Sequence, residues 1–320
     1  MKSTRKAYGE FLVEYGKKDT SIVVFDADLA SATQTALFKE KFPERHFDIG
    51  IAEQDMVGTA CGMAIDGDKK VFASSFAMFL AGRAYEQIRN TAAYSNININ
   101  FCATHSGISV GEDGATHQCI EDIALMNVIP NMKIFSPADE VSTKKVLEQC
   151  IFLNTPKYIR LGRKDTPDIY SFDEEFHLGG SKQFGKGTDG TIFATGMTVS
   201  IALEAKEELK KLGKEVRVVD LYSIKPIDEE RIIQCAKETK TLISIEDHSV
   251  IGGIGSIIAN VLCQKFPKKL YKIGIKDVFG TSGEATLLYQ QFGLTKEHII
   301  QKFTLKTKRN NFVTKENMIK

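Results

Sequence analysis

The chain has 320 residues, enough for about two domains with sizeable cores. Its 42 basic and 41 acidic residues leave a net charge of +1, which disfavours nucleic acid as a partner. No apolar run approaches the ~20 residues that span a bilayer, and the first residues lack the apolar segment of a secretory signal. We therefore expect neither a nucleic-acid nor a membrane partner.

The six cysteines show no C-x-x-C pair, and most of them lie in apolar stretches. This pattern predicts neither a disulfide framework nor a metal site in this chain, and it favours a cytoplasmic protein. The cysteines are Cys61, Cys102, Cys119, Cys150, Cys235 and Cys263.

The first half of the chain alternates short apolar runs with helical patterns. The runs at residues 22–25, 71–73, 99–102 and 133–135 are typical of strands buried on both faces. A helix is expected to begin near Pro137, with acidic residues in its first turn. Such alternation predicts right-handed βαβ units on a largely parallel sheet, which we assign to residues 1–165.

Residues 166–190 are polar and then rich in glycine, which predicts a linker. The alternation resumes with strands at 191–194, 216–219, 242–245 and 272–275 and a helix over 199–212. The sequence thus predicts an α/β protein with two domains, each a largely parallel sheet flanked by helices. The second domain covers residues 191–306, and a flexible basic tail covers 307–320.

Glu53 is the first candidate for a functional residue. It lies in the first turn of an expected helix that follows a strand, and ligands of open α/β sheets bind at such strand ends. A solvated acid that complements the helix dipole explains the same position, so the spacing leaves both interpretations open.

The second candidate is the loop at residues 105–118, HSGISVGEDGATHQ, which follows an expected strand. It holds two histidines and two acids, and three glycines allow a tight fold and close approach of a ligand. The spacing of His105 and His117 matches no common metal-ligand pattern. A catalytic loop and a surface loop with solvated histidines remain as interpretations.

Other segments leave a functional and a structural interpretation open. Phe76 and Phe79 could form an aromatic platform or belong to the core. Arg163 follows an expected strand and could hold a phosphate, whereas Arg5 is a surface residue by default. The glycine-rich residues 251–255 resemble a phosphate cradle but lack its strand register and acid, so we predict packing there.

Taken together, these segments resemble the C-terminal half of a transketolase, in particular the C-terminal subunit of split bacterial transketolases. GIAEQDM at 50–56 resembles the motif around the family's glutamate, and the 105–118 loop resembles H-D-x-I-x-x-G-E-D-G-P/A-T-H-Q. TRK, ADL, SPAD, LGR and IEDH, which begin at residues 4, 27, 136, 161 and 245, also match. The resemblance extends to about residue 305 and implies a pyrimidine-binding domain followed by a transketolase C-terminal domain.

The resemblance implies a site for the pyrimidine ring of thiamine diphosphate. Glu53 corresponds to the residue that hydrogen-bonds N1′ and so promotes loss of the proton from the thiazolium C2. Phe76 and Phe79 correspond to the aromatic pocket that stacks on the pyrimidine. Asp28 corresponds to an acid beside the cofactor at the subunit interface.

It also implies a site for sugar phosphates, between which a two-carbon ketol unit is moved from a ketose to an aldose, as in the pentose phosphate pathway. His105 and His117 correspond to residues that contact substrate hydroxyls and assist proton transfers. Asp113 corresponds to the carboxylate that binds the hydroxyl beside the ketose carbonyl, and Arg5 and Arg163 to the arginines that hold the phosphate.

The chain departs from the family pattern in the substrate and interface segments. Ser106 stands where an aspartate is usual, and Asp55 replaces the residue common after Glu-Gln. The family's interface serine after ADL could be represented by Ser31 or by Thr33.

The largest departure is the missing G-D-G motif with an asparagine about 30 residues later, which holds Mg²⁺ and the diphosphate in this family. We therefore expect a separate N-terminal subunit that carries these ligands, in an α2β2 heterotetramer with the active site at the interface. Alternatives are a 1-deoxyxylulose-5-phosphate synthase-like half, the β subunit of a 2-oxoacid dehydrogenase, or a catalytically silent structural subunit.

Overall fold

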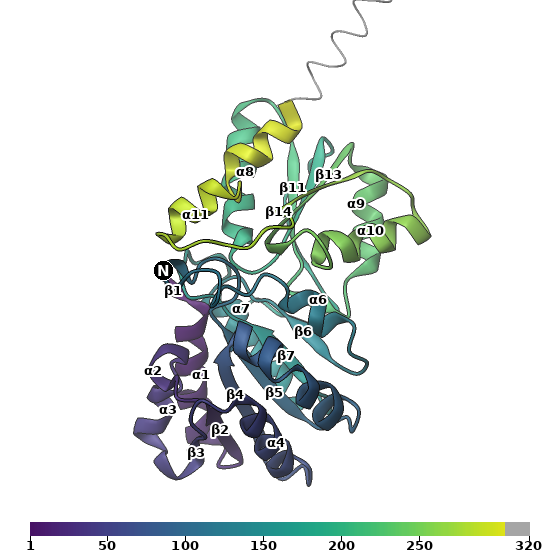
Figure 1. Ribbon diagram of the computed structural model, residues 1–320. Helices are drawn as coiled ribbons and strands as arrows, with labels where there is room; N and C mark the ends of the chain where they lie inside the picture. The colour runs from purple at the N-terminus through teal and green to yellow at the C-terminus, as the bar shows by residue number, and fades with distance from the viewer. Residues whose placement is uncertain (305–320) are drawn as a thin grey trace, which may run out of the picture.

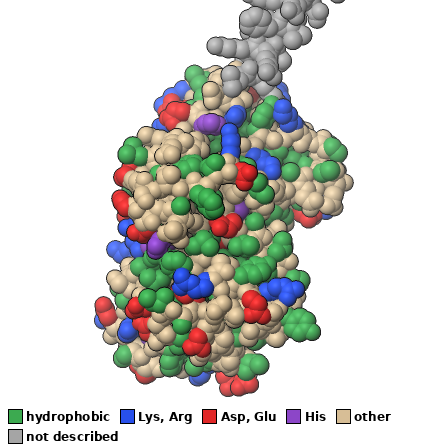
Figure 2. Space-filling view, in the orientation of Figure 1, with side chains coloured by type: hydrophobic (Ala, Val, Ile, Leu, Met, Phe, Trp, Pro, Cys, Tyr) green, Lys and Arg blue, Asp and Glu red, His purple; other side chains and the backbone are tan. Residues whose placement is uncertain are grey.

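The computed structural model describes residues 1–304 and contains two α/β domains, one above the other in Figure 1. In each, a mostly parallel sheet is flanked by helices, which confirms the predicted fold class. The domains form separate lobes in Figure 2, where histidine side chains (purple) are visible near the level at which the lobes meet. The tail predicted for residues 307–320 lies outside the described residues.

The first sheet has seven strands in the order β12-β6-β7-β5-β4-β2-β3. All neighbours are parallel except β12, which pairs antiparallel with β6. In chain order, the strands are β2 (Ile22–Asp26), β3 (His46–Asp48), β4 (Lys70–Phe76), β5 (Ile99–Thr104), β6 (Lys133–Phe135), β7 (Lys157–Arg160) and β12 (Ser223–Lys225). The four apolar runs predicted as strands lie within β2, β4, β5 and β6.

Helices cover both faces of this sheet. They are α1 (Thr4–Lys18), α2 (Ala30–Thr33), α3 (Ala36–Lys41), α4 (Glu53–Ala64), α5 (Tyr85–Gln87), α6 (Asp122–Asn127) and α7 (Glu140–Phe152), with short helices η1 (Pro43–Arg45) and η4 (Gly111–Asp113) and π-helical turns η2 (Met78–Arg83) and η3 (Ile88–Ala93). Helix α7 begins at Glu140 and not at Pro137, because Asp139 and Ser142 form a reciprocal capping box there.

The second sheet has the order β14-β13-β10-β11-β9, with only the edge strand β9 antiparallel. Its strands are β9 (Lys182–Phe184), β10 (Gly190–Ala194), β11 (Val216–Asp220), β13 (Thr241–Ser249) and β14 (Leu270–Ile275). Its helices are α8 (Thr198–Lys211), α9 (Glu229–Glu238), α10 (Ile254–Lys265) and α11 (Ala285–Gln291).

The stretch predicted as a linker, residues 166–190, is packed against both domains. Strand β8 (Asp165–Thr166) pairs antiparallel with β1 (Lys2–Ser3) at the N-terminus, and β9 joins the second sheet. Between them, Tyr170 and Phe176 are buried in the core. Because β12 returns from the second half of the chain to the first sheet, the domains are joined at more than one place.

A buried acid fixes this stretch. The Tyr170 hydroxyl donates to Asp220 Oδ2 at 2.7 Å, at the end of β11. Burial raises the pKa of Asp220 to about 8, and nearby Asp139 adds to the shift. Asp220 is therefore largely protonated at neutral pH in the folded protein.

Asp220 should make the protein less stable as the pH rises. Its folded pKa of about 8 lies above its unfolded value of ~3.9, so its contribution is full below pH ~4 and is lost as the pH rises toward 8. The loss amounts to at most about 1.4 kcal/mol per pH unit. Asp220→Asn keeps an acceptor for Tyr170 without titrating, so its unfolding free energy relative to the parent, from urea denaturation, should increase between pH 5 and pH 8. A difference that does not change with pH would contradict this.

Candidate active site

The predicted site residues gather where parallel strands of the first sheet end. Glu53 follows β3, Phe76 ends β4, the 105–118 loop follows β5, and Arg163 follows β7. The carboxyl ends of parallel strands share one edge, and ligands of α/β sheets bind outside that edge. Strand order therefore brings together segments that are distant in the sequence.

A buried carboxylate and two aromatic rings form one part of the site. Glu53 begins α4 and is 1% exposed, and its Oε2 accepts a hydrogen bond of 2.5 Å from Arg83 Nη1. The Arg83 guanidinium lies 4.7 Å from the centroid of Phe79, whose ring stacks on Phe76 at 5.7 Å. Sequence reasoning missed Arg83, because residue spacing does not reveal the π-helical turn η2 on which it lies.

His105 links the aromatic rings to the arginines. Its ring stacks on Phe76 at 3.8 Å, and its backbone has a φ of +58°, a strained value for this residue type. Nε2 lies 3.4 Å from Arg5 Nη1, and Nδ1 lies 2.9 Å from Thr104 Oγ1. Since arginine can only donate, Nε2 is the acceptor and Nδ1 carries the proton.

The charge of His105 follows from its surroundings. Burial, followed by the positive charges of Arg5 and Arg163, lowers the pKa of His105 to about 3. The imidazole is therefore neutral at pH 7. His117, the other histidine of the loop, meets the ring of Phe79 edge-on at 5.2 Å and is partly exposed. Both histidines thus lie against the aromatic pair.

Arg5 and Arg163 come together from opposite ends of the first domain. Burial, and then the positive charge of Arg163, lowers the pKa of Arg5, because both disfavour its charged form. Arg5 Nη1 donates to Ala32 O at 2.7 Å, but its buried Nε has no hydrogen-bond partner among the described residues. Two neighbouring cations and an unpaired buried donor are features that favour an anion.

Asp113 lies beside Arg163 and is exposed. Its Oδ2 is 3.7 Å from Arg163 Nη1, and the neighbouring Glu112 lies 3.9 Å from the same nitrogen. Arg163 Nη1 also donates to Val110 O. The structure therefore brings Asp113 to the arginine side of the site, at the mouth of the loop.

Asp28 stands apart from this group. It is exposed at the end of β2, and its backbone N–H donates to Asp48 Oδ1 at 2.9 Å. The same segment holds Ser31 and Thr33, the two candidates for the interface serine. Thr33 is buried and donates to Asp26 Oδ2 at 2.7 Å, whereas Ser31 is exposed and could meet a partner.

Ser106 and Asp55, the two residues that depart from the family pattern, direct their side chains to other partners. Ser106 Oγ donates to Leu161 O at 3.0 Å, so this buried side chain is engaged by the backbone. Asp55 is exposed on α4, where it accepts a hydrogen bond from Thr59. Neither side chain joins the group around the aromatic rings.

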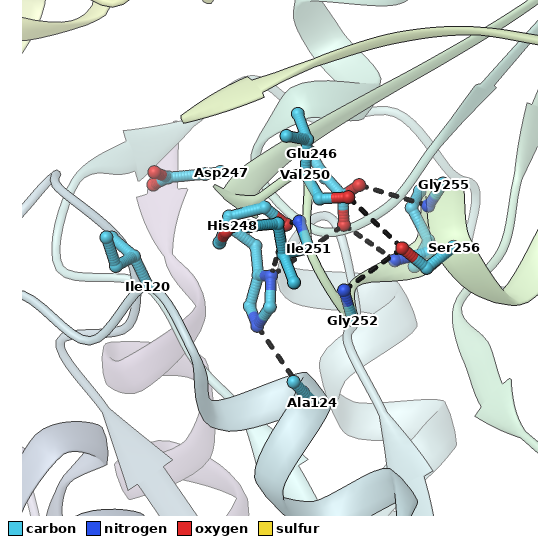
Figure 3. A network of polar contacts seen from close by, with 12 residues as sticks. Ile120, Ala124, Glu246, Asp247, His248, Val250, Ile251, Gly252, Gly255 and Ser256 are labelled. Carbon is cyan, nitrogen blue, oxygen red and sulfur yellow. Dashed lines mark hydrogen bonds and ion pairs between the residues drawn. The ribbon is translucent and has the colours of Figure 1, made fainter. Parts of the chain in front are cut away.

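The glycine-rich residues 251–255, for which a packing role was predicted, bind the side chain of Glu246. Glu246 accepts hydrogen bonds from the N–H groups of Ile254 at 2.6 Å and Gly255 at 3.0 Å, at the start of α10 (Figure 3). A Cβ on Gly253 would come within 1.9 Å of Glu246 Oε2. The Glu246 carboxylate thus takes the place that a phosphate would have at this helix N-terminus.

The donor set fits one half of thiamine diphosphate. A buried carboxylate beside a partly exposed aromatic face can pair with the polar edge of a flat pyrimidine and stack on it. Over residues 1–304, no cluster of three or more histidine, cysteine or acidic side chains could hold a metal ion. The same residues contain no helix long and apolar enough to cross a membrane.

Comparisons with known proteins cover almost the whole chain. The family models for the transketolase pyrimidine-binding and C-terminal domains match residues 1–168 and 179–299. A putative transketolase C-terminal section from Methanocaldococcus jannaschii is 49% identical over 96% of this chain and 97% of its own length. The 6-deoxy-6-sulfo-D-fructose transketolase subunit SqwH of Clostridium sp. is 37% identical over 96% of this chain and 95% of its own. Among solved structures, a split-gene transketolase described as an inactive β4 tetramer matches with a TM-score of 0.88 and 44% identity, over 95% of this chain and 97% of that chain.

His105 should stay neutral, with its proton on Nδ1, from pH 8 down to about pH 4, because its pKa is about 3. Nitrogen-15 NMR of histidine-labelled protein reads both the charge and the tautomer. Arg5→Met removes a like charge and should raise the pKa of His105. Lys6→Met, at an exposed position beside Arg5, is the control and should not change it. A parent His105 that titrates near pH 6.5 would overturn this description.

Proposed function

Because the chain belongs to the transketolase family of thiamine-diphosphate-dependent transferases, we propose that it is the C-terminal subunit of a split transketolase. In this proposal, it transfers a two-carbon ketol unit from a ketose phosphate to an aldose phosphate. The observation that carries the proposal is the buried Glu53 carboxylate beside the stacked Phe76 and Phe79 rings, with both loop histidines against those rings.

When bound, thiamine diphosphate supplies a nucleophilic carbon that cleaves the ketose and carries the two-carbon unit. Glu53 would hold N1′ of the pyrimidine, and Phe79 would offer its partly exposed face for stacking. The hydrogen bond from Arg83 uses Glu53 Oε2, so Oε1 is the oxygen that can pair with N1′. Arg83 would then keep the carboxylate oriented toward the ring.

The residues around His105 would bind and orient the sugar. As a neutral imidazole, His105 can accept a hydrogen bond from a substrate hydroxyl at Nε2, and His117, edge-on to Phe79, can contact a second hydroxyl. Asp113 would accept a hydrogen bond from the hydroxyl beside the ketose carbonyl. Arg5 and Arg163, with the unpaired Arg5 Nε, would hold the phosphate at the mouth.

The diphosphate half of the cofactor site would come from an N-terminal subunit that binds Mg²⁺, in an α2β2 heterotetramer. The missing G-D-G…N motif supports this division, as does the fact that a relative is named as a transketolase subunit. So does the solved split-gene β4 tetramer, which is described as inactive. Exposed Asp28 and Ser31 would then face the partner. A cytoplasmic location and a role in the pentose phosphate pathway are further predictions of this proposal.

The proposal is tested by reconstitution with a candidate partner that carries G-D-G…N. The isolated chain should show no ketol transfer and no tight binding of thiamine diphosphate by calorimetry, whereas the assembled complex with Mg²⁺ should be active.

In the assembled complex, Glu53→Gln should slow deuterium exchange at C2 of the bound cofactor by roughly 10²–10⁴-fold, the range of general acid–base catalysis. Asp55→Asn removes an exposed acid two residues away and is the matched control. Ketol transfer by the isolated chain would refute the split site, and unchanged exchange in Glu53→Gln would refute the role of Glu53.

The phosphate role of Arg163 predicts a loss that depends on the substrate. A charge-assisted hydrogen bond contributes roughly 1.5–3 kcal/mol, so Arg163→Ala should raise KM for phosphorylated donors about 10- to 100-fold. Small unphosphorylated ketol donors should be nearly unaffected, since they do not reach the arginine pair. Lys164→Ala is the control, because Lys164 is a neighbouring cation whose Nζ donates a hydrogen bond to Thr286 Oγ1. Equal losses for both donor types would assign Arg163 a structural role.

A further inference from the structure

The 105–118 loop is held between the two domains. Its ends are joined where Gly107 N–H donates to Cys119 O at 2.8 Å, and Gln118 Nε2 reaches Thr281 O of the second domain at 2.9 Å. The loop therefore returns to its starting point and cannot leave the first sheet at either end. Its middle is held by Gln118, whose Nε2 also lies 3.4 Å from Ile108 O, by Arg163 at Val110 O, and by the second domain.

Three glycines of the loop have positive φ values and approach the second domain closely, and a side chain at Gly107 or Gly114 would collide with it. A Cβ would lie 2.1 Å from Asp247 Oδ2 at Gly107, 3.3 Å from Gly283 O at Gly111, and 2.3 Å from Ser282 Oγ at Gly114. The loop and the second domain are thus fitted to each other along the length of the loop.

Asp247 is the side chain that reaches the loop backbone. Its Oδ1 accepts a hydrogen bond from Ile108 N–H at 3.0 Å, and its Oδ2 accepts one from the Tyr289 hydroxyl of α11 at 2.8 Å. The residue is buried, and Figure 3 shows it directed away from its neighbour Glu246 on β13. One carboxylate therefore joins the catalytic loop to a helix of the second domain.

The first domain holds Asp247 in return. Arg160, at the end of β7, donates from Nη2 to the backbone oxygen of Asp247 at 2.7 Å. The same guanidinium donates from Nε to Asp122 Oδ2 at 2.8 Å, and both residues of this pair are buried. Buried ion pairs contribute little net stability, but they define geometry because a broken one leaves an uncompensated charge. The position of Asp247 is therefore fixed from both sides.

We propose that Asp247 is a positioning residue for the ketol transfer: it sets the backbone at Ile108 so that His105 and His117 lie against the aromatic rings. This inference rests on the proposed function. Ile108 is three residues beyond the strained His105, so a shift of its N–H would relax the backbone that stacks His105 on Phe76. The second domain would then take part in catalysis without contributing a group to the reacting atoms.

Hydrogen–deuterium exchange of the isolated chain, followed by mass spectrometry, tests the geometry without a partner or an activity. Asp247→Ala leaves the Ile108 N–H without its acceptor and should speed exchange in the 105–118 peptide roughly 10-fold or more. Peptides of β2 and β4 should be unchanged. Asp247→Asn retains an oxygen for Ile108 and an amide for Tyr289, so it should restore most of the protection. Glu246→Gln, which alters the cap of α10, is the control and should leave the loop unchanged.

If Asp247→Ala does not fold, Tyr289→Phe removes one of the two contacts with little change in volume and should give a smaller increase confined to the same peptide. Exchange that rises evenly over the whole chain, or a loop that is unaffected, would overturn the proposal. In the assembled enzyme, Asp247→Ala should lower kcat for phosphorylated and unphosphorylated donors alike, leave the Kd of thiamine diphosphate unchanged, and be rescued by Asp247→Asn. An inactive parent complex would refute the proposed function alone, because the exchange result does not depend on it.

Discussion

The close contact between the 105–118 loop and the second domain is the constraint on which the arrangement of the site depends. A backbone that approaches a neighbouring domain this closely leaves no room for a Cβ at Gly107 or Gly114 and little room at Gly111. Glycine loses more conformational freedom on folding than other residues do, but at these positions it allows the loop to follow a defined path past the ends of β4 and β5. The positive φ of His105 persists because both ends of the loop are tied, and the imidazole is thereby placed on the Phe76 ring.

Two groups of charged residues lie on either side of the 105–118 loop. On the open side of the loop, Arg5 and Arg163 place two positive charges at the mouth, and burial, followed by these charges, lowers the pKa of His105 and keeps its imidazole neutral. On the buried side, Arg160 is neutralised by Asp122 and bonded to the backbone of Asp247. The first group consists of two like charges near each other, whereas in the second Arg160 has an acidic partner within the protein.

The sequence predicted the fold well where a segment is buried on both faces, because continuous apolar runs such as 22–25 and 71–73 have few alternatives to a parallel strand. It also located the candidate site, since the loop histidines, Glu53 and the two phenylalanines lie in recognisable segments. It did not predict β12, which crosses to the first sheet, because pairing with a distant edge leaves no mark on a three-residue strand. The sequence also did not predict that residues 166–190 pack against both domains, because their partners are likewise distant in the chain.

The missed site residues share a physical explanation. Arg83 contacts Glu53 from a π-helical turn, a backbone form that residue spacing does not reveal. The segment IEDH was noticed only as part of the resemblance, and its residues act through distant partners.

On β13, Glu246 caps α10, Asp247 holds the loop, and His248 Nε2 accepts the N–H of Ala124 in α6 at 3.4 Å (Figure 3). Alternation along the strand sends Asp247 to one face and its two neighbours to the other. Burial lowers the pKa of His248 to about 4, so its imidazole is neutral and can act as this acceptor. Three adjacent side chains thus satisfy backbone groups of three separate elements, two of them in the first domain. The second domain therefore helps to hold the loop that carries His105 and His117.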